Sequence, residues 1–545
     1  MKVLLGIFAL FLVVTSCKKN DTSTTSGSSN IVVDSVFIGG KYVGYGATLH
    51  NIPLGSATIK VSFLNAVTPD LFSKDAISIS NGIDFNYQFS QDGKSLELTT
   101  KTGFSALTSY ALNIPEGKCQ AGGKIVAGYK AYFVTVVDST PKFPLLSDSA
   151  LLTKVQQQTF RYFWDFAHPS CGMARERNTS GDVVTTGGSG FGVMALVVGM
   201  QRGFITRSQG LARFGQVLTF LETCDRFYGA WPHWLNGITG KTVPFSSTDD
   251  GGDLVETSYM VQGLITMRQY LDSTVTAEKS LITRINALNN SVEYDWYTHG
   301  ENVLYWQWSP DYGWASNVKI QGYNETLITY VIAATSTTHP VSSDVYKSGY
   351  TRNGAFKNGN SYYGYLLPLG EPYGGPLFFT QYTYLGLDPR HLQDAYANYW
   401  EQNVNHSLIN WSYCAANPRN YVGYSTDCWG LTASDNPWGY NAHSPTNDLG
   451  VITPTAAVSS IPYTPTQSLK AIRYFYYVLG DKLWGDYGFY DAFDMTDSWW
   501  ASSYIAIDEG PIICMIENYR TGLLWNLFMS APEVKKGLDK LSFTY

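Results

Sequence analysis

The chain has 545 residues, too many for a single hydrophobic core, so at least two domains are expected. Its residues are 44% hydrophobic and 15% charged, which is the composition of an ordered globular protein rather than a disordered one. The net charge is −7 and no long basic run occurs, which argues against nucleic-acid binding because phosphates require clustered lysine and arginine.

The N-terminus resembles an export signal. Lys2 precedes an apolar stretch over 3–14 that is too short to span a membrane. Val14-Thr15-Ser16-Cys17 resembles a bacterial lipobox, so we expect a lipoprotein signal peptide over 1–17 and lipidation at Cys17. An ordinary secretory peptide with an incidental cysteine is the alternative. Residues 18–30 are polar and rich in Ser and Thr, which predicts a flexible tether. The expected location is the cell envelope, anchored by lipid in the outer membrane and facing the periplasm or the surface.

Residues 31–138 show the short, alternating, β-branched segments of an all-β domain. Turns rich in Gly, Asn, Asp and Pro separate them, a spacing typical of a sandwich of about 100 residues. The segment 109–115, followed by a Gly-rich turn, resembles bacterial immunoglobulin-like modules. We therefore predict an Ig-like β-sandwich over 31–138 and a linker over 139–149. The predicted strands are 31–33, 58–63, 95–99 and 132–136.

From residue 150 to 545 the apolar spacing becomes helical. Long loops rich in Gly, Pro and aromatic residues separate the candidate helices, and few strands are expected. About a dozen helices with elaborate loops are typical of an (α/α) toroid, whose site lies at one end. The candidate helices are 149–166, 192–202, 208–227, 254–271, 278–294, 321–334, 391–414, 466–479 and 511–529.

Acidic residues cluster over 248–257, at the start of an apolar run. Asp253 and Glu256 are spaced i, i+3 on a predicted helix and share a face, and Asp249 lies in the loop before it. Acids in this position also cap a helix and offset its dipole, an explanation that suits Asp253 better than Glu256. Two carboxyl groups beside aromatic rings predict a site that cleaves glycosidic bonds.

Two further acidic positions have aromatic neighbours. Glu325 follows a tryptophan-rich stretch, and burial there would raise its pKa into the range that a general acid needs. A solvated helix residue is the alternative. Asp508 and Glu509 follow Trp499, Trp500 and Tyr504, and again a helix cap is an alternative.

Polar and aromatic residues near these acids are candidates for substrate binding. Arginine and histidine could bind sugar hydroxyls or keep carboxylates ionised, although structural ion pairs are an equal alternative. A loop containing Asp435, Trp438 and His443 is long enough to suggest a functional role. The candidate binding residues are Arg175, Trp231, His233, Trp234, Trp308, Trp314, Tyr323, Trp438 and Glu509.

The cysteines predict neither a metal site nor a redox site. Besides Cys17, six are present and none falls in a C-x-x-C pair, so most are expected to be buried free thiols. We expect no metal and no cofactor.

Residues 150–541 resemble the bacterial glycoamylase domain of glycoside hydrolase family 144. The resemblance implies an (α/α)6 barrel and inverting hydrolysis of β-1,2-glucan, a neutral polysaccharide, in endo or oligosaccharide-releasing mode. It matches acidic family positions to Asp249, Asp253, Glu256 and Glu325, and a late acid to Asp508 or Glu509. We expect Glu325 to be the general acid. The base or water-positioning carboxylate is expected among Asp249, Asp253, Glu256 and Asp508, and outer-membrane glycan-uptake proteins are the expected partners. The matching stretches are 159–169, 248–257, 320–326, 370–379, 428–435 and 506–512.

Two other functions are compatible with a toroid. A polysaccharide lyase needs a base and a group that neutralises a uronate, but the excess of acids at the predicted site argues against an anionic substrate. A non-catalytic surface glycan-binding protein would explain the aromatic residues but not the clustered carboxylates.

Overall fold

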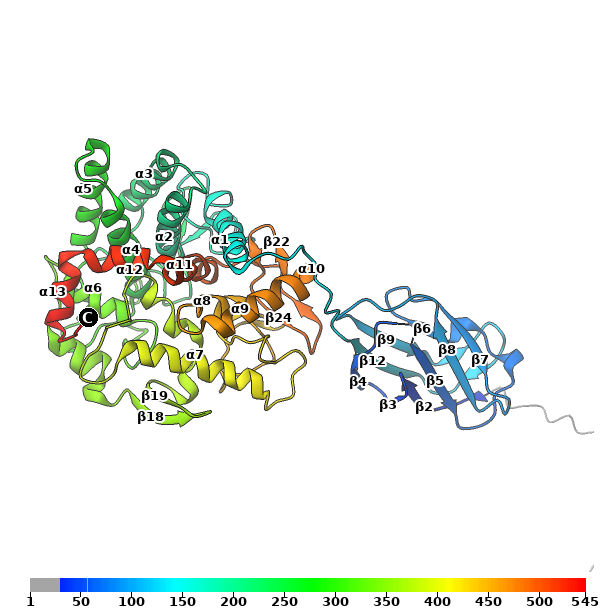
Figure 1. Ribbon diagram of the computed structural model, residues 1–545. Helices are drawn as coiled ribbons and strands as arrows, with labels where there is room; N and C mark the ends of the chain where they lie inside the picture. Colours follow the sequence, from blue (N-terminus) through cyan, green and yellow to red (C-terminus); the bar gives the residue numbers. More distant parts are fainter. Residues whose placement is uncertain (1–29, 56) are drawn as a thin grey trace, which may run out of the picture. The chain divides into compact units, whose positions relative to one another are not determined.

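The computed structural model describes residues 30–55 and 57–545 (Figure 1). The predicted signal peptide, the lipidation site Cys17 and the predicted tether up to residue 29 lie outside the described residues. Among the residues that are described, no helix is long and apolar enough to cross a membrane. The chain divides into two compact units, with the boundary between Val136 and Val137.

The N-terminal unit is built from β-strands around one hydrophobic core. Phe63 and Leu98 from one sheet and Tyr110 and Phe133 from another belong to the same buried cluster. Side chains along Thr58–Phe63 alternate between exposed and buried, as expected for strands with one face on a core. The five-stranded sheet has the order β3 (Lys41–Val43), β2 (Val33–Ile38), β5 (Thr58–Phe63), β8 (Ser95–Thr100), β7 (Phe85–Phe89). The four-stranded sheet has the order β4 (Thr48–Ile52), β12 (Tyr129–Thr135), β9 (Ser109–Ile114), β6 (Ser78–Ile79).

The four-stranded sheet is mixed, and the five-stranded sheet is antiparallel. β12 pairs with β4 in parallel and with β9 antiparallel, whereas the strands of the five-stranded sheet pair antiparallel throughout. A small third sheet joins β1 (Asn30–Ile31), β11 (Lys124–Ile125) and β10 (Gly117–Lys118). The predicted strand 58–63 has the observed bounds, whereas the predicted strand 31–33 is divided between β1 and β2.

The C-terminal unit is helical, with an inner and an outer layer. The inner helices are buried on almost every side, and most of their side chains are apolar or small, with a few buried polar residues in α4 and α11. They are α2 (Thr186–Arg202), α4 (Leu254–Tyr270), α6 (Leu327–Thr335), α8 (Pro454–Ser459) and α11 (Ala506–Thr521). The outer elements bury one face only. They are α1 (Asp148–Trp164), α3 (Arg207–Thr223), α5 (Thr276–Asn290), the π-helical η4 (Val345–Tyr350), α7 (Tyr399–Ala416) and α9 (Pro465–Arg473).

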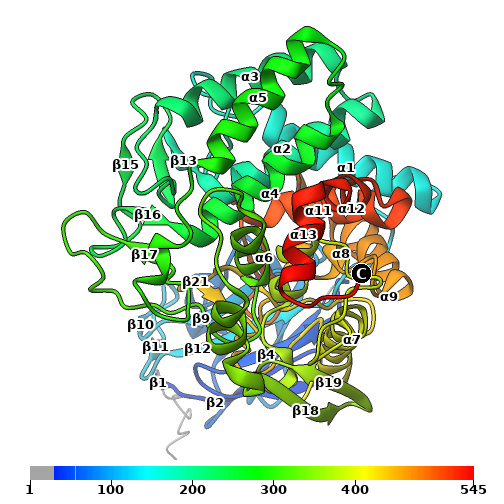
Figure 2. The ribbon, with the colours of Figure 1, turned by 90° about the vertical axis from the view of Figure 1, so that its left-hand side faces the viewer.

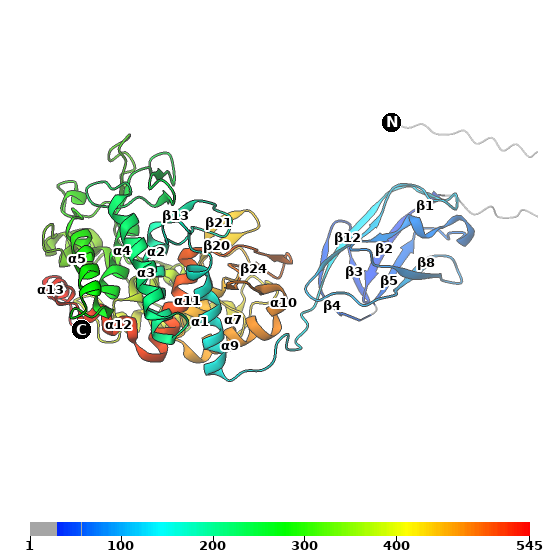
Figure 3. The same cartoon turned by 90° about the horizontal axis from the view of Figure 1, so that it is seen from above.

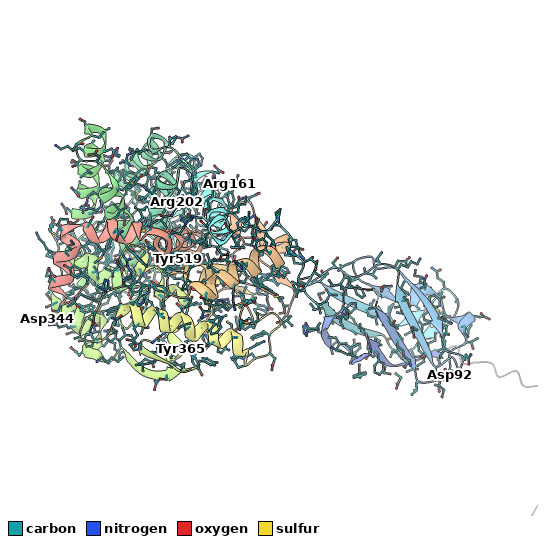
Figure 4. The ribbon with its side chains drawn as sticks, viewed as in Figure 1. Asp92, Arg161, Arg202, Asp344, Tyr365 and Tyr519 are labelled. Carbon is teal, nitrogen blue, oxygen red and sulfur yellow. The ribbon has the colours of Figure 1, made fainter. Side chains whose placement is uncertain are left out.

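The inner elements form a closed ring. Helix α2 packs between α4 and α11, α4 packs on α6, and α11 packs on α8. Two 3-10 turns, η7 (Leu377–Thr380) and η8 (Thr383–Leu385), fill the gap between α6 and α8, where Gln381 Nε2 donates to Ala456 O at 3.1 Å. Arg202, labelled in Figure 4, donates to Glu517 at 2.7 Å and ties α2 to α11. Figure 2 shows α3 and α5 side by side on the outer side of α2 and α4.

Several predicted helix bounds are wrong, each for a local reason. The predicted helix 511–529 is two helices, α11 and α12 (Leu523–Ser530), because Gly522 adopts a left-handed conformation with φ 68°. α2 begins at Thr186 rather than 192, since packing overrides the poor helix propensity of Gly187 and Gly188. Helix α6 begins only at Leu327 and α7 only at Tyr399. The sequence prediction missed α8, α10 (Gly480–Leu483) and α13 (Pro532–Lys540).

Short strand pairs connect the helices, and two of them lead into inner helices. β13 (Val183–Thr185) leads directly into α2 and β16 (Gly252–Asp253) leads into α4, so these pairs position the N-terminal ends of two inner helices. Figure 3 shows β20 and β21, which pair as a hairpin. The remaining pairs are β14 (Trp234–Asn236) with β15 (Thr242–Val243), β17 (Gln307–Trp308) with β16, β18 (Lys357–Tyr362) with β19 (Tyr365–Leu369), β20 (Ala433–Asn436) with β21 (Gly439–Ala442), β22 (Trp484–Gly485) with β23 (Gly488–Phe489) and β24 (Phe493–Asp494) with β25 (Trp499–Trp500).

The predicted linker residues contact the helical unit. The backbone N–H of Lys142 donates to Tyr477 O at 2.7 Å, and the Phe143 and Tyr476 rings lie 4.6 Å apart. The chain from Val137 onward therefore belongs to the C-terminal unit.

Candidate active site

A cavity of about 410 Å³ opens at the N-terminal ends of the inner helices. Its volume lies within the range of about 300–1,000 Å³ typical of ligand pockets. Three carboxylates, one arginine, one histidine and many aromatic rings line it. They are Glu176, Arg177, Thr185, His233, Trp234, Phe245, Glu256, Tyr259, Trp306, Glu325, Phe378, Tyr382, Ala433, Tyr440, Ala442, Ile505 and Ile507. We call it the active-site cavity below.

Asp253 is the N-cap of α4. Its Oδ1 accepts from the backbone N–H groups of Val255 and Glu256, both at 2.9 Å. Its Oδ2 accepts from Trp306 Nε1 at 3.3 Å and lies 3.0 Å from His233 Nδ1. Asp253 is fully buried and does not line the cavity. The capping role therefore accounts for this residue, and it acts on the cavity by orienting His233 and Trp306.

Glu256 faces the cavity from the first turn of α4. Its Oε2 accepts from the backbone N–H of Gly187 at 2.6 Å and from Thr185 Oγ1 at 3.4 Å. Gly187 is required here, since a Cβ atom on it would lie 2.6 Å from the same carboxylate oxygen. Burial raises the pKa of Glu256, and the positive charge of His233 opposes that rise. Glu256 is therefore held in one orientation, with an ionised partner beside it.

His233 carries a proton at neutral pH. Burial alone would lower its pKa, but the charge of Glu256 and the hydrogen bond with Asp253 outweigh burial and raise the pKa to about 9. Its Nε2 lies 4.0 Å from Glu256 Oε1. The ring stacks on Phe245, with centroids 4.2 Å apart. The imidazolium can thus bind a sugar hydroxyl and stabilise an ionised Glu256.

Glu325 reaches the cavity from the turn before α6, so it is not inside the predicted helix 321–334. Its backbone oxygen accepts from Thr383 Oγ1 at 2.5 Å, which anchors the turn to the inner ring. Burial raises the pKa of Glu325 to about 7, and the charges of Glu371 and Glu256 add to this rise. A carboxylic acid with this pKa can donate a proton near neutral pH.

Asp249 lies behind His233 rather than in the cavity wall. Burial and the charge of Asp253 raise its pKa to about 7, and its Oδ1 has no hydrogen-bond partner among the described residues. Ligand-type atoms of His233, Asp249 and Asp253 lie within 4.8 Å of one another. A cation would need a deprotonated His233, which a pKa of about 9 opposes near neutral pH. We interpret the trio as an ion-paired support for His233.

Asp508 and Glu509 occupy the first turn of α11 and are almost fully buried. Tyr382, which lines the cavity, donates to Asp508 Oδ1 at 3.4 Å. Burial and the charge of Asp491 raise the pKa values of both Asp508 and Glu509. Neither Asp508 nor Glu509 therefore lines the cavity, and Asp508 is linked to it through the Tyr382 hydroxyl.

Arg177 lines the cavity, although the sequence prediction selected Arg175 as the binding residue. Its Nε donates to Glu176 Oε2 at 2.9 Å, and its Nη1 donates to both carboxylate oxygens of Asp435 at 3.1 Å. The predicted residue Arg175 instead donates to the backbone oxygens of Gly181 and Phe166, outside the cavity. The two arginines are indistinguishable in sequence, and only the fold shows which one reaches the site.

The structure places the predicted aromatic residues in different surroundings. Trp234 lines the cavity, and Trp306, Phe245, Tyr259, Tyr382 and Tyr440 join it although they were not predicted. Trp231 is fully buried and donates to Leu221 O at 3.1 Å. Trp308 and Trp314 pack on Trp296, and Tyr323 donates to Asn403 Oδ1 at 2.9 Å. Trp438 is 68% exposed at the tip of the β20–β21 hairpin. The cavity wall therefore contains none of these five predicted residues, Trp231, Trp308, Trp314, Tyr323 and Trp438.

His443 and the cysteines have reactive side chains, but in this structure they are structural residues. Burial lowers the pKa of His443 to about 4, so this ring is neutral. Among the described residues the six cysteines Cys119, Cys171, Cys224, Cys414, Cys428 and Cys514 are buried and unpaired, as the sequence predicts.

Comparisons with known proteins match this unit to β-1,2-glucan hydrolases. Residues 317–532 match the Glycoamylase family. The crystal structure of an endo-β-1,2-glucanase from Chitinophaga pinensis, bound to sophorotriose and glucose, is 53% identical, with a TM-score of 0.72; the match covers 74% of this chain and 99% of that one. A β-1,2-glucanase structure from Parabacteroides distasonis is 37% identical, with a TM-score of 0.71, over 95% of this chain and 73% of that one.

A curated relative from Parabacteroides distasonis is 46% identical over 451 residues, which is 76% of this chain. It is an exo β-1,2-glucooligosaccharide sophorohydrolase acting at the non-reducing end. The match spans 62% of the length of that relative.

Proposed function

Because the chain belongs to the Glycoamylase family, we propose that it is an inverting glycoside hydrolase that cleaves β-1,2-glucan. The observation that carries the proposal is the pair of Glu325 and Glu256 in one aromatic-lined cavity, with pKa values raised by burial. Two relatives that match it closely act on β-1,2-glucan or its oligosaccharides. A lyase is disfavoured, because the carboxylates that line the cavity would repel a uronate.

Glu325 is the proposed general acid, and Glu256 is the proposed base that activates or positions water. Of the four carboxylates considered for the base from the sequence, Asp249, Asp253, Glu256 and Asp508, only Glu256 lines the cavity. Burial gives Glu256 a raised pKa, but the imidazolium of His233 opposes this rise and favours the ionised form that a base needs. Glu325, with a pKa of about 7, is protonated below about pH 7. An inverting enzyme needs one protonated and one ionised carboxyl, with room for water between them.

The first test of the function is product analysis on β-1,2-glucan and on α-glucan in parallel. Anomer-resolved NMR should show release of the α-anomer from β-1,2-glucan, because inversion of a β-linkage yields it, and no product from α-glucan. Chromatography of the same samples distinguishes endo from exo cleavage. Binding of the glucan without any product would instead indicate the non-catalytic glycan-binding protein.

Replacing Glu256 tests the assignment of the base. We expect Glu256→Gln to lower kcat on β-1,2-glucan by roughly 10²–10⁴-fold, the range for loss of a general base. The amide keeps the size of the side chain, so the measurement is steady-state kinetics on protein with wild-type thermal stability. Asp508→Asn is the comparison variant. A larger loss in Asp508→Asn than in Glu256→Gln would transfer the base to Asp508.

We propose the cell envelope as the location, with a lipid anchor at Cys17. The lipobox-like sequence before Cys17 supports this anchor. A Cys17→Ala variant is then expected to move from the detergent phase to the aqueous phase when cell extracts are partitioned with Triton X-114, whereas Thr22→Ala stays in the detergent phase. Wild-type protein in the aqueous phase would contradict the anchor. Outer-membrane glycan-uptake proteins are the proposed partners, because an anchored glucanase releases short products close to them.

The finer fold assignments are part of the proposal. Among the described residues, five inner helices, the η7–η8 segment in the sixth inner position and six outer elements support an (α/α)6 toroid for 150–545. Two sheets around one core support an Ig-like sandwich for 31–138, which we propose to be a spacer or an accessory glycan-contacting domain.

A further inference from the structure

A second cavity, of about 490 Å³, adjoins the active-site cavity. The β20–β21 hairpin, strand β25 and the segment Arg177–Thr179 form its walls. Arg177 and Tyr440 line both cavities, so the two are consecutive compartments separated by shared side chains. Figure 3 shows β20, β21 and β24, the strand that pairs with β25, at the same edge of the unit. We call this compartment the outer cavity.

The walls of the outer cavity suit a neutral sugar. Trp499 lines the cavity with an aromatic ring, which can cover the apolar face of a pyranose, whereas the Lys482 ammonium lies over the ring of Trp500, 5.8 Å from its centroid. Trp500 is fixed by stacking on Phe493, with ring centroids 5.2 Å apart and planes 9° apart. Its Nε1 has no hydrogen-bond partner among the residues that the structure describes. That atom is buried, so Trp500 shapes the wall of the cavity, and Trp499 is the ring available to a sugar.

The charges at the junction of the cavities also favour a neutral ligand. Arg177 is held between Glu176 and Asp435, and Ser503 Oγ donates to Asp435 Oδ2 at 2.6 Å. The two carboxylates neutralise the guanidinium, so an anion gains little there. Within the described part of the chain, Arg177 Nη2 donates no hydrogen bond, which leaves it free for a hydroxyl.

We propose that the outer cavity binds further glucosyl units of the same β-1,2-glucan chain whose scissile bond lies in the active-site cavity. The inference rests on the proposed function and adds chain-length selectivity to it. A substrate that fills both compartments gains contacts that a short oligosaccharide cannot make. The specificity constant, kcat/KM, therefore rises with chain length until the outer cavity is filled.

Two variants of opposite kind test the outer cavity. Trp499→Ala removes a ring from its wall, and Ser502→Trp places one in the space that the sugar would occupy. Both are expected to lower kcat/KM on long β-1,2-glucan by about tenfold, equivalent to about 1.4 kcal/mol of binding, and to change it less than about twofold on the shortest cleaved oligosaccharide. Trp411→Ala on the outer helix α7 is the matched control, because Trp411 lines neither cavity.

The outcomes separate this proposal from the proposed function. A wild-type protein that does not cleave β-1,2-glucan would refute the function. An active wild type whose dependence on chain length is unchanged in both variants would overturn only the outer subsite. An equal loss at every chain length would do the same, since it would report a general disturbance of the site.

Discussion

Glu325→Gln is expected to hydrolyse β-1,2-glucan about a thousandfold more slowly than the wild type, within the range of roughly 10²–10⁴ for loss of a general acid. The glutamine keeps the shape of the side chain but has no acidic proton to give to the leaving oxygen. The turn that carries Glu325 is anchored through its backbone oxygen by Thr383, so the fold should persist. Initial rates on β-1,2-glucan, with a thermal unfolding scan of each protein, measure the effect.

The pH dependence gives the same residue a second signature. Because burial raises the pKa of Glu325 to about 7, the fraction that can donate a proton falls as the pH rises above that value. The wild-type kcat/KM should therefore decline above about pH 7, and this decline should be absent from the residual activity of Glu325→Gln. Glu401→Gln on α7, where the carboxylate is exposed, serves as a matched control and should behave as wild type. Near-normal turnover of Glu325→Gln would assign the proton to another group.

The helical architecture could be predicted, but the bounds of its segments could not. Apolar periodicity marks α1, α3 and α5 because each buries one face. The inner elements have no polar face, so periodicity says little about where they start. Pro454–Ser459 is too short to recognise, and the bend at Gly522 depends on a conformation rather than on a residue pattern.

The acidic residues of the site could be predicted more reliably than its other walls. Glu256 and Glu325 are sequence candidates that line the cavity, whereas the other candidate acids Asp249, Asp253, Asp508 and Glu509 do not. Nothing in the sequence separates Arg175 from Arg177, since both lie in one loop. In the fold, Arg175 forms a β-bridge with Val184 in β13, whereas Arg177 forms one with Ile505. Nor does the sequence distinguish Trp306, which lines the cavity, from Trp308, which packs on Trp296.

The most sensitive contact in the ring is the crossing of α2 and α4 at two glycines. A Cβ atom on Gly263 would overlap the carbonyl oxygen of Gly190, and one on Gly190 would overlap the carbonyl oxygen of Tyr259. These obstacles are backbone atoms of two inner helices, so no side chain can rotate away. Both helices also carry the cavity, since Glu256 on α4 accepts from Gly187 on α2 at 2.6 Å. The close approach that permits this hydrogen bond therefore depends on the absence of side chains at the crossing.

Gly263→Ala is accordingly expected to lower the free energy of unfolding of the helical unit by roughly 3 kcal/mol, because overpacking costs more than alanine gains in helix propensity. Gly215→Ala on the outer helix α3 is the matched control, since a Cβ atom there meets nothing within 4 Å. That variant should gain up to about 1 kcal/mol. Denaturant unfolding of the full chain, followed by circular dichroism at a helical wavelength, compares the two. Equal stability of both variants would mean that the inner helices can separate without loss, and the ring would then not be the rigid support that holds Glu256 against Gly187.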